Sequence, residues 1–245
     1  MLLPWQTGTI TRIEHETGST RRFWISVEGI QAFHFAPGQF VTLDLPIHEK
    51  PNKRWRSYSI ASWPDGSNVF ELVIVLLEGG LGTQYLFNEC IVGSKLTLRG
   101  PLGVFTLPAL MDRDIFLICT GTGVAPFRAM AHHIYNHNIA HQEIYLIFGC
   151  RKKSDCLYMD ELDQLQQDLP SFHYIPTFSR EQPGTYRTGY VHSVYEELCN
   201  SKRNGGNEYP AYFYLCGWKN MIDEAKLKIG QLGYDRKSVH QELYG

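Results

Sequence analysis

The sequence predicts two domains, an antiparallel β-barrel over residues 1–108 followed by an α/β domain with a parallel sheet over residues 109–245. In the first half, β-rich runs alternate with turns roughly every ten residues. From Asp114 on, apolar runs alternate with helix-like stretches. The pattern changes within LPALMDR, residues 107–113. A chain of 245 residues that is 43% hydrophobic is long enough to bury two cores.

The first half contains β-rich runs separated by Gly, Pro and Asn, at residues 7–16, 20–27, 35–45, 56–62, 69–77 and 94–100. Evenly spaced short strands of this kind are typical of an antiparallel barrel or sandwich. In the run RSYSIAS, the period of two places Arg56 and Tyr58 on one face. An arginine beside an aromatic ring indicates that this face is neither core nor plain surface.

The second half alternates apolar runs at 115–121, 143–149, 171–179 and 211–217 with helix-like stretches at 125–138, 158–170, 189–199 and 221–233. Strands alternating with helices predict a parallel sheet that is covered on both faces. Ligands of such sheets bind beyond the carboxyl ends of the strands. The loops after these runs are therefore where we expect a site.

Composition and charge exclude several classes of function. The net charge of -2 argues against a nucleic-acid binder, which would need a basic excess. No apolar run approaches the span of about 20 residues that crosses a bilayer, and the N-terminus has no basic leader. The six cysteines form no CxxC pair and indicate reduced thiols, so we expect a cytoplasmic protein without a bound metal. His133 and His137 are four apart, but no third ligand completes a metal set.

Two glycine-rich segments could each hold an anion on free backbone amides. EGGLGTQYL, residues 78–86, precedes a possible short helix at Thr83, and GTGVAP, residues 121–126, opens a helix after an apolar strand. GTGVAP is not the GxGxxG fingerprint, and either segment alone could be an ordinary tight turn. One dinucleotide would need only one such cradle, so the pair indicates two ligands.

Four motifs, RSYSIAS, GPLG at 100–103, GTGVAPFR and YLCGWKNM, occur in an order and at distances that resemble the ferredoxin-NADP reductase family, especially its plant-type branch. The resemblance covers essentially the whole chain. It implies a flavin-binding barrel, a pyridine-nucleotide domain, and FAD and NADP(H) as cofactors.

The resemblance implies a flavin site made of Arg56, Ser57, Tyr58, Ser59, Val73, Ile74, Val75, Gly80, Leu81, Gly82, Thr83, Thr122 and Tyr244. In the family, the arginine contacts the pyrophosphate, the tyrosine lies against the isoalloxazine and the serine after it points to N5. Strand 73–75 passes along the ribityl chain, and Thr83 stands where the family usually has serine. Arginine suits a diphosphate, and an aromatic ring offers a stacking surface.

The resemblance implies a nucleotide site made of Gly121, Thr122, Gly123, Ser179, Arg180, Tyr186, Arg187, Cys216, Gly217 and Met221. Ser179 and Arg180 match the family's S-R-E-Q and are expected at the 2'-phosphate. The family usually presents a lysine before its tyrosine here, and this chain instead has Arg187 after Tyr186. A solvated loop in which Arg180 only pairs with Glu181 is the alternative.

The ending HQELYG resembles the plant-type E-x-Y, which implies that Glu242 lies near the active centre and Tyr244 stacks on the flavin. The chain departs from the family by carrying Gly245 after the aromatic, and a plain terminal strand is the alternative. Ser59, Cys216, Glu242 and Tyr244 are then the expected catalytic residues, with Cys216 positioning rings because the reaction needs no thiolate.

The expected function is hydride transfer between NADPH and FAD, with electrons then passed singly to a ferredoxin, a flavodoxin or a related iron-sulfur acceptor. We expect the enzyme to be a monomer. An acidic partner protein could be steered to it by basic residues that precede the flavin motif, namely Lys50, Lys53 and Arg54. The alternatives are the NADH-dependent reductase component of an oxygenase and a flavin-binding interaction module without catalysis.

Overall fold

The computed structural model of the protein describes residues 3–182, 184–203 and 209–244, with only the backbone of Tyr244. Its contacts divide the chain into two compact units. One comprises Met1–Thr106 with Arg128–His133, and the other comprises Leu107–Phe127 with Ile134–Gly245. The predicted domain boundary after residue 108 stays a prediction.

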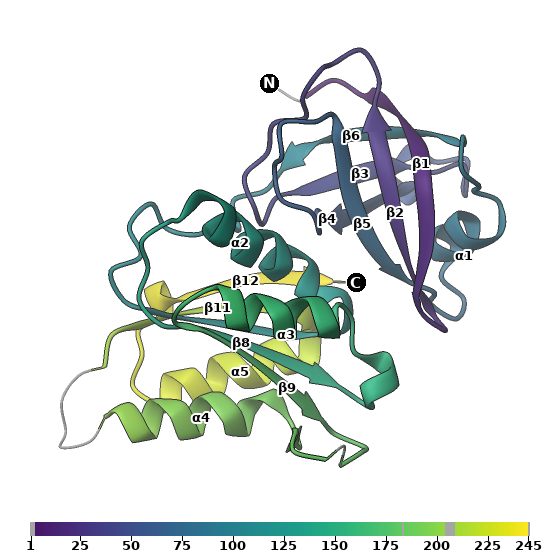
Figure 1. Ribbon diagram of the computed structural model, residues 1–245. Coiled ribbons are helices and arrows are strands. Elements are labelled where there is room, and N and C mark those ends of the chain that lie inside the picture. Colours follow the sequence, from purple (N-terminus) through teal and green to yellow (C-terminus); the bar gives the residue numbers. More distant parts are fainter. Residues whose placement is uncertain (1–2, 183, 204–208, 245) are drawn as a thin grey trace. The chain divides into compact units, whose positions relative to one another are not determined.

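The first unit is built on a six-stranded antiparallel sheet of order β4-β3-β6-β1-β2-β5 (Figure 1). The strands are β1 (Gln6–Thr17), β2 (Thr20–Val27), β3 (Phe40–Asp44), β4 (Trp55–Ser59), β5 (Val69–Val75) and β6 (Lys95–Leu102). Just past β4, the Ala61 amide donates to the Glu71 carbonyl of β5 at 2.8 Å. The first and last strands of the order therefore meet there, and the sheet bends round on itself.

Alternating side chains of these strands form the core of the first unit. Phe23, Ile25 and Val27 of β2 are buried at every second position and pack in one apolar cluster. This is the period of two expected for a sheet with one buried face. The unit also contains a one-turn helix η1 (Pro51–Lys53) and the short helix α1 (Leu81–Asn88), which begins directly after Gly80.

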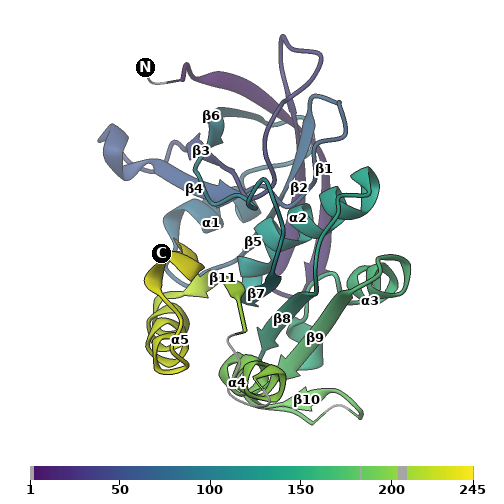
Figure 2. The same ribbon diagram turned by 90° about the vertical axis from the view of Figure 1, so that its left-hand side faces the viewer.

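The second unit is built on a six-stranded, all-parallel sheet of order β10-β9-β8-β7-β11-β12 (Figure 2). The strands are β7 (Asp114–Thr120), β8 (Ile144–Cys150), β9 (Phe172–Phe178), β10 (Arg187–Thr188), β11 (Ala211–Trp218) and β12 (Val239–Tyr244). The predicted fold class, a β domain followed by an α/β domain, is confirmed. Of the two outermost strands, β10 is absent from the strand runs identified in the sequence, and β12 coincides with the terminal strand that the sequence offered only as an alternative.

Helices cover the parallel sheet. They are α2 (Val124–His137), α3 (Met159–Asp168), α4 (Val191–Lys202) and α5 (Lys219–Gln231), with one-turn helices η2 (Gly121–Gly123), η3 (Lys153–Asp155) and η4 (Arg236–Ser238). Helices α4 and α5 share a buried cluster with Phe116, Phe213 and Leu215 of the sheet, and α3 lies over the opposite face (Figure 1). Strand β7 is consequently buried along nearly its whole length.

None of the helices in the described parts of the chain has the length and apolar character that a membrane span requires. Within those same parts, no three His, Cys, Asp or Glu side chains gather as metal ligands would.

Candidate functional site

Arg56 lies against the amino end of helix α1. A Cβ added to Gly82, the second residue of that helix, would lie 2.9 Å from Arg56 Cγ and 3.2 Å from its Nε. Nη1 of the same guanidinium donates to the carbonyl oxygens of Lys53 at 3.1 Å and Trp55 at 2.8 Å. The first amides of a helix have no intrahelical acceptor, and its amino end carries partial positive charge. The combination of cation and free amides suits a diphosphate.

The Thr83 hydroxyl fixes the backbone that leads into helix α1. Oγ1 donates to the Gly80 carbonyl at 3.0 Å and accepts from the Leu77 amide at 3.1 Å. The single hydroxyl proton is thereby engaged, so a direct bond to phosphate would require the hydroxyl to rotate. That contact stays a prediction, while the amides at Leu81 and Gly82 fit the anion without any rearrangement.

Strand β4 carries Tyr58 and Ser59 just after Arg56. Tyr58 packs against the core of the first unit, and burial, only partly offset by the neighbouring Arg56 charge, raises the pKa of its hydroxyl to about 12. Ser59 is 4% exposed, and the Ser57 hydroxyl lies 3.0 Å from Thr42 Oγ1. The strand therefore presents a neutral aromatic ring with a fixed position, which is the surface that a flat heterocycle needs.

Strand β5 turns the backbone groups of Val73 and Val75 away from its neighbour β2. The Glu71 amide donates to Ser62 Oγ at 3.0 Å and its carbonyl accepts from the Ala61 amide, so both groups point away from β2. Backbone polar groups of an antiparallel strand alternate sides with a period of two, so those of Val73 and Val75 face the same side as those of Glu71, away from β2. This geometry supports the predicted passage of a ribityl chain along the strand.

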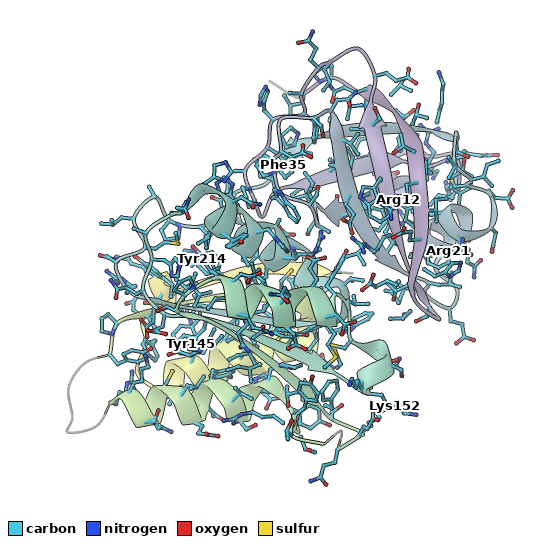
Figure 3. The ribbon with its side chains drawn as sticks, viewed as in Figure 1. Arg12, Arg21, Phe35, Tyr145, Lys152 and Tyr214 are labelled. Atoms are coloured by element: carbon cyan, nitrogen blue, oxygen red, sulfur yellow. The ribbon has the colours of Figure 1, made fainter. Side chains whose placement is uncertain are left out.

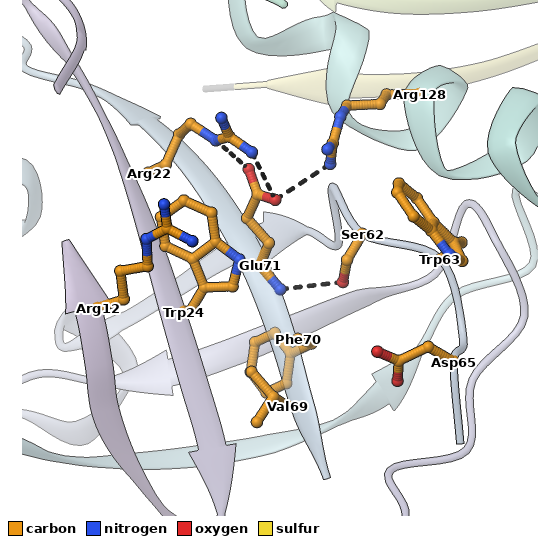
Figure 4. A pocket seen from close by; sticks show the side chains of 10 residues that line it. All are labelled: Arg12, Arg22, Trp24, Ser62, Trp63, Asp65, Val69, Phe70, Glu71 and Arg128. Atoms are coloured by element: carbon orange, nitrogen blue, oxygen red, sulfur yellow. Dashed lines mark hydrogen bonds and ion pairs between the residues drawn. The ribbon is translucent and has the colours of Figure 1, made fainter. Parts of the chain in front are cut away.

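The Glu71 side chain is the centre of a buried ion network that lines a cavity in the first unit (Figure 4). Its carboxylate, 2% exposed, accepts from Arg22 Nε at 2.6 Å and from Arg128 Nη1 at 3.1 Å. Arg128 also donates to the Ala61 carbonyl at 2.8 Å. Arg22 Nη1 also lies 3.5 Å from Glu16 Oε2, so each guanidinium has a carboxylate partner, and we interpret the cavity as support for strand β5. Sequence analysis missed this network because Arg128 stands far from Glu71 along the chain.

In the second unit, β7 ends in the turn predicted to hold the nicotinamide nucleotide. Gly121 has a φ of 55°, a backbone conformation that favours glycine. A Cβ on Gly123 would lie 2.7 Å from the Cys216 carbonyl carbon and 3.1 Å from the Gly217 amide nitrogen. Only a residue without a side chain allows β11 to approach so closely. Thr122 lies between the two glycines, and α2 begins directly after them. The Val124 amide donates to the Gly121 and Thr122 carbonyls and Pro126 has no N–H, so the amides that could bind an anion here are those of the turn itself.

Cys216 and Glu242 are neighbours at the carboxyl edge of the parallel sheet. In the strand register, Cys216 lies opposite Cys119 of β7 on one side and Glu242 of β12 on the other. Cys216 is fully buried. A Cβ on Gly217, which has a φ of 149°, would lie 3.0 Å from Met221 Cε. The second unit thus brings together Glu242 from the C-terminal motif HQELYG and Cys216 from YLCGWKNM, as the sequence predicted. Ser59 belongs to the first unit.

Thr120, next to the glycine turn, was not among the predicted site residues, and we add it as a further prediction. Its Oγ1 is buried and has no hydrogen-bond partner in the described residues. A buried hydroxyl in this state needs a partner, which a nucleotide on the adjoining glycine turn would supply. The available signal was a polar residue at the end of an otherwise apolar strand, immediately before Gly121.

Tyr244 pairs through its backbone with Trp218 of β11. Its side chain and all of Gly245 lie outside the described residues, so the stacking of Tyr244 on the flavin stays a prediction.

The loops after β8 and β9 lie side by side and carry the residues expected at the 2'-phosphate. The Ser179 amide donates to the Cys150 carbonyl at 3.0 Å, and the Arg180 amide donates to the Arg151 carbonyl at 2.9 Å. Basic residues from both loops therefore lie on one rim of the second unit.

Arg187 was predicted to lie with Ser179 and Arg180 at the 2'-phosphate, but its guanidinium is bound elsewhere. Its Nη1 and Nη2 donate to the two carboxylate oxygens of Glu197 on α4, at 2.6 and 2.9 Å. The hydrogen bond to Glu197 raises the pKa of Arg187 further. Because a bidentate pair of this kind fixes the guanidinium, Arg187 could replace the family's lysine only by leaving Glu197. Tyr186, by contrast, packs edge-on against Phe178 at 5.9 Å.

Known oxidoreductases resemble this chain over nearly its whole length. Residues 7–107 match the family described as an oxidoreductase FAD-binding domain, and residues 117–226 match an oxidoreductase NAD-binding domain. Over 216 residues the chain is 36% identical to ferredoxin--NADP reductase B of Sorangium cellulosum, covering 87% of each protein. The chain belongs to the ferredoxin-NADP reductase family. The predicted resemblance, the enzyme class and the need for FAD and a nicotinamide nucleotide are thereby confirmed.

Other members of this family group are similar to lower degrees. The chain is 29% identical over 223 residues to the 2-halobenzoate 1,2-dioxygenase electron transfer component of Burkholderia cepacia, covering 90% of this chain and 62% of that one. The crystal structure of the Amycolatopsis cytochrome P450 reductase GcoB matches with a TM-score of 0.85 at 25% identity, covering 98% of this chain and 70% of that one. The reductase is thus an FAD- and nicotinamide-dependent oxidoreductase with relatives that differ in their electron acceptors.

Proposed function

We propose that this reductase moves a hydride between NADPH and FAD and exchanges electrons singly with a separate ferredoxin, flavodoxin or related iron-sulfur carrier. When bound, FAD supplies the step from a two-electron to a one-electron reaction. The chain's own contribution is binding and alignment. Arg56 with the amino end of α1 would hold the flavin diphosphate, and the turn at residues 121–123 would hold that of NADPH.

The position of Glu181 is the observation that supports NADPH, and not NADH, as the proposed nucleotide. Its carboxylate accepts the Lys153 amide at 2.6 Å, so this acid is turned onto the backbone of the neighbouring loop. Arg180 is exposed on the same rim. A 2'-phosphate needs cationic donors and no opposing carboxylate, and this arrangement supplies both conditions.

We propose a protein carrier as the acceptor, because all six cysteines of this sequence are buried, free thiols and none of them is available to ligate an iron-sulfur cluster. Buried reduced thiols also suit a reducing compartment, and we place the enzyme in the cytoplasm on that ground. Arg54 is committed to Asp44, through bonds of 2.8 and 2.7 Å, so Lys50 and Lys53 are the residues left to steer an acidic carrier. The halobenzoate dioxygenase relative, an electron transfer component, supports the second candidate, the reductase component of an oxygenase, for which we expect NADH as the nucleotide.

Replacing Arg180 by alanine tests the nucleotide choice. We expect kcat/KM for NADPH to fall by one charge-assisted contact, about 1.5 to 3 kcal/mol, with little change for NADH. Arg187→Ala is the matched control, since its guanidinium is bound to Glu197, and it should leave NADPH use nearly unchanged. Equal losses with both nucleotides, or a parent enzyme that prefers NADH, would favour the oxygenase reductase.

A further inference from the structure

We infer that Lys153 supplies the second positive charge at the 2'-phosphate of NADPH, in place of the lysine that the tyrosine-bearing loop lacks. This inference rests on the proposed use of NADPH and names a specificity-determining residue for it.

Lys153 reaches this position because two loops are joined at the carboxyl ends of neighbouring strands. Strands β8 and β9 pair in parallel, and the loop after each continues the contact. The Ser179 amide bonds to the Cys150 carbonyl, the Arg180 amide bonds to the Arg151 carbonyl, and the Lys153 amide bonds to the Glu181 carboxylate. A residue near position 153 is therefore fixed beside the S-R-E-Q segment despite its distance in sequence.

The side chain of Lys153 is directed to the same place by Tyr186. Its Nζ lies 5.4 Å from the centre of the Tyr186 ring, within the range of a cation–π contact. The ring is held by an edge contact with Phe178 and by a hydroxyl bond to Asp163 at 3.4 Å. The ammonium group is therefore kept on a fixed ring beside the predicted phosphate position. The carboxylate in its field is Asp163, whose pKa is raised by burial and lowered by the Lys153 charge.

The acids around this rim are turned to other partners. Asp155 accepts from Arg151 Nε at 3.1 Å, Glu181 accepts the first amide of η3, and Asp163 accepts the Tyr186 hydroxyl. The Lys153 ammonium group has only the electrostatic contact with Asp163, which already bonds to the Tyr186 hydroxyl, and Arg180 is exposed, so both cations could bind a more strongly charged anion. A dianionic phosphate would bring them together at a shared ligand.

Lys152 provides a matched comparison one position earlier. It is exposed like Lys153 and projects from the loop after β8 (Figure 3). If diffuse positive charge on this loop were sufficient, the two lysines would contribute equally. If the contact on Tyr186 positions the charge, only Lys153 should matter.

Calorimetry on the FAD-loaded enzyme with 2',5'-ADP and 5'-AMP separates these cases, since the two probes differ only in the 2'-phosphate. The parent should bind 2',5'-ADP more tightly. Lys153→Ala should weaken 2',5'-ADP binding by on the order of tenfold and change 5'-AMP binding by less than about twofold. Lys153→Arg should keep most of the affinity, and Lys152→Ala should resemble the parent.

Three results would overturn the inference. Unchanged 2',5'-ADP binding by Lys153→Ala would remove Lys153 from the site while leaving NADPH use intact. An equal loss in Lys152→Ala would replace a positioned contact by diffuse charge. A parent enzyme that binds both probes alike would contradict NADPH specificity itself, and the role of Lys153 would fall with it.

Discussion

Replacing Gly82 by alanine should weaken FAD binding without unfolding the protein. The added methyl would lie 2.9 Å from Arg56 Cγ, 3.2 Å from Nε and 3.4 Å from Cδ, so the Arg56 arm must move off the amino end of α1. Loss of one charge-assisted contact to the diphosphate costs about 1.5 to 3 kcal/mol, or roughly ten- to hundredfold in the dissociation constant for FAD. The apoprotein itself should change little, because alanine is better than glycine in a helix by up to about 1 kcal/mol.

The measurement is a titration of the apoprotein with FAD, followed by flavin fluorescence, beside a denaturant unfolding curve of each apoprotein. Gly18→Ala is the matched control, since a Cβ there would meet nothing within 4 Å. It should bind FAD as the parent does. The double variant with Arg56→Ala tests the cause, because Gly82→Ala should add no further loss once the arginine side chain is gone.

Parent-like FAD affinity in Gly82→Ala would refute the assignment of Arg56 and α1 as one cradle. A full additional loss in the Arg56→Ala background would show that the methyl acts on the helix backbone and not through the arginine.

Two further outcomes are expected. Glu71→Gln should lower the free energy of unfolding by about 3 to 5 kcal/mol, since it removes the charge partner of the buried Arg128 guanidinium, whereas Arg22 keeps Glu16 at 3.5 Å. The exposed Glu28→Gln should cost under about 1 kcal/mol, and similar losses from both would contradict the buried network. Ser59→Ala and Glu242→Ala enzymes should keep their flavin, but NADPH should reduce that flavin on the order of ten- to hundredfold more slowly in stopped-flow mixing, because Ser59 and Glu242 align the reacting groups. Colourless variants would assign these residues to flavin retention instead.

Local sequence patterns were sufficient to predict those parts of the fold that are determined by residues close together in the sequence. The alternation in β4 predicts that Arg56 and Tyr58 share a face, and both are half-buried while Trp55 and Ser57 are exposed. The apolar runs of the second half gave four strands of the parallel sheet. The short strand β10 escaped because two exposed residues carry no periodic signal.

Contacts between distant segments could not be predicted in this way. Nothing near Gly123 in the sequence indicates that its missing side chain makes room for the Cys216 carbonyl. The contact between Lys153 and Tyr186 likewise depends on the pairing of β8 with β9, which juxtaposes two loops that the chain order separates. The family pattern predicts a lysine on the loop after β9, next to Tyr186. In the structure, the lysine that contacts the Tyr186 ring is Lys153, on the loop after β8.

Anaerobic titration of the purified enzyme with NADPH and with NADH tests the central claim most directly. We predict a yellow protein that contains one FAD per chain. One equivalent of NADPH should bleach the oxidised-flavin absorbance, and one equivalent of NADH should bleach it far more slowly. A colourless protein, or a flavin that neither nucleotide reduces, would contradict hydride transfer by this chain; faster bleaching by NADH would contradict the choice of NADPH.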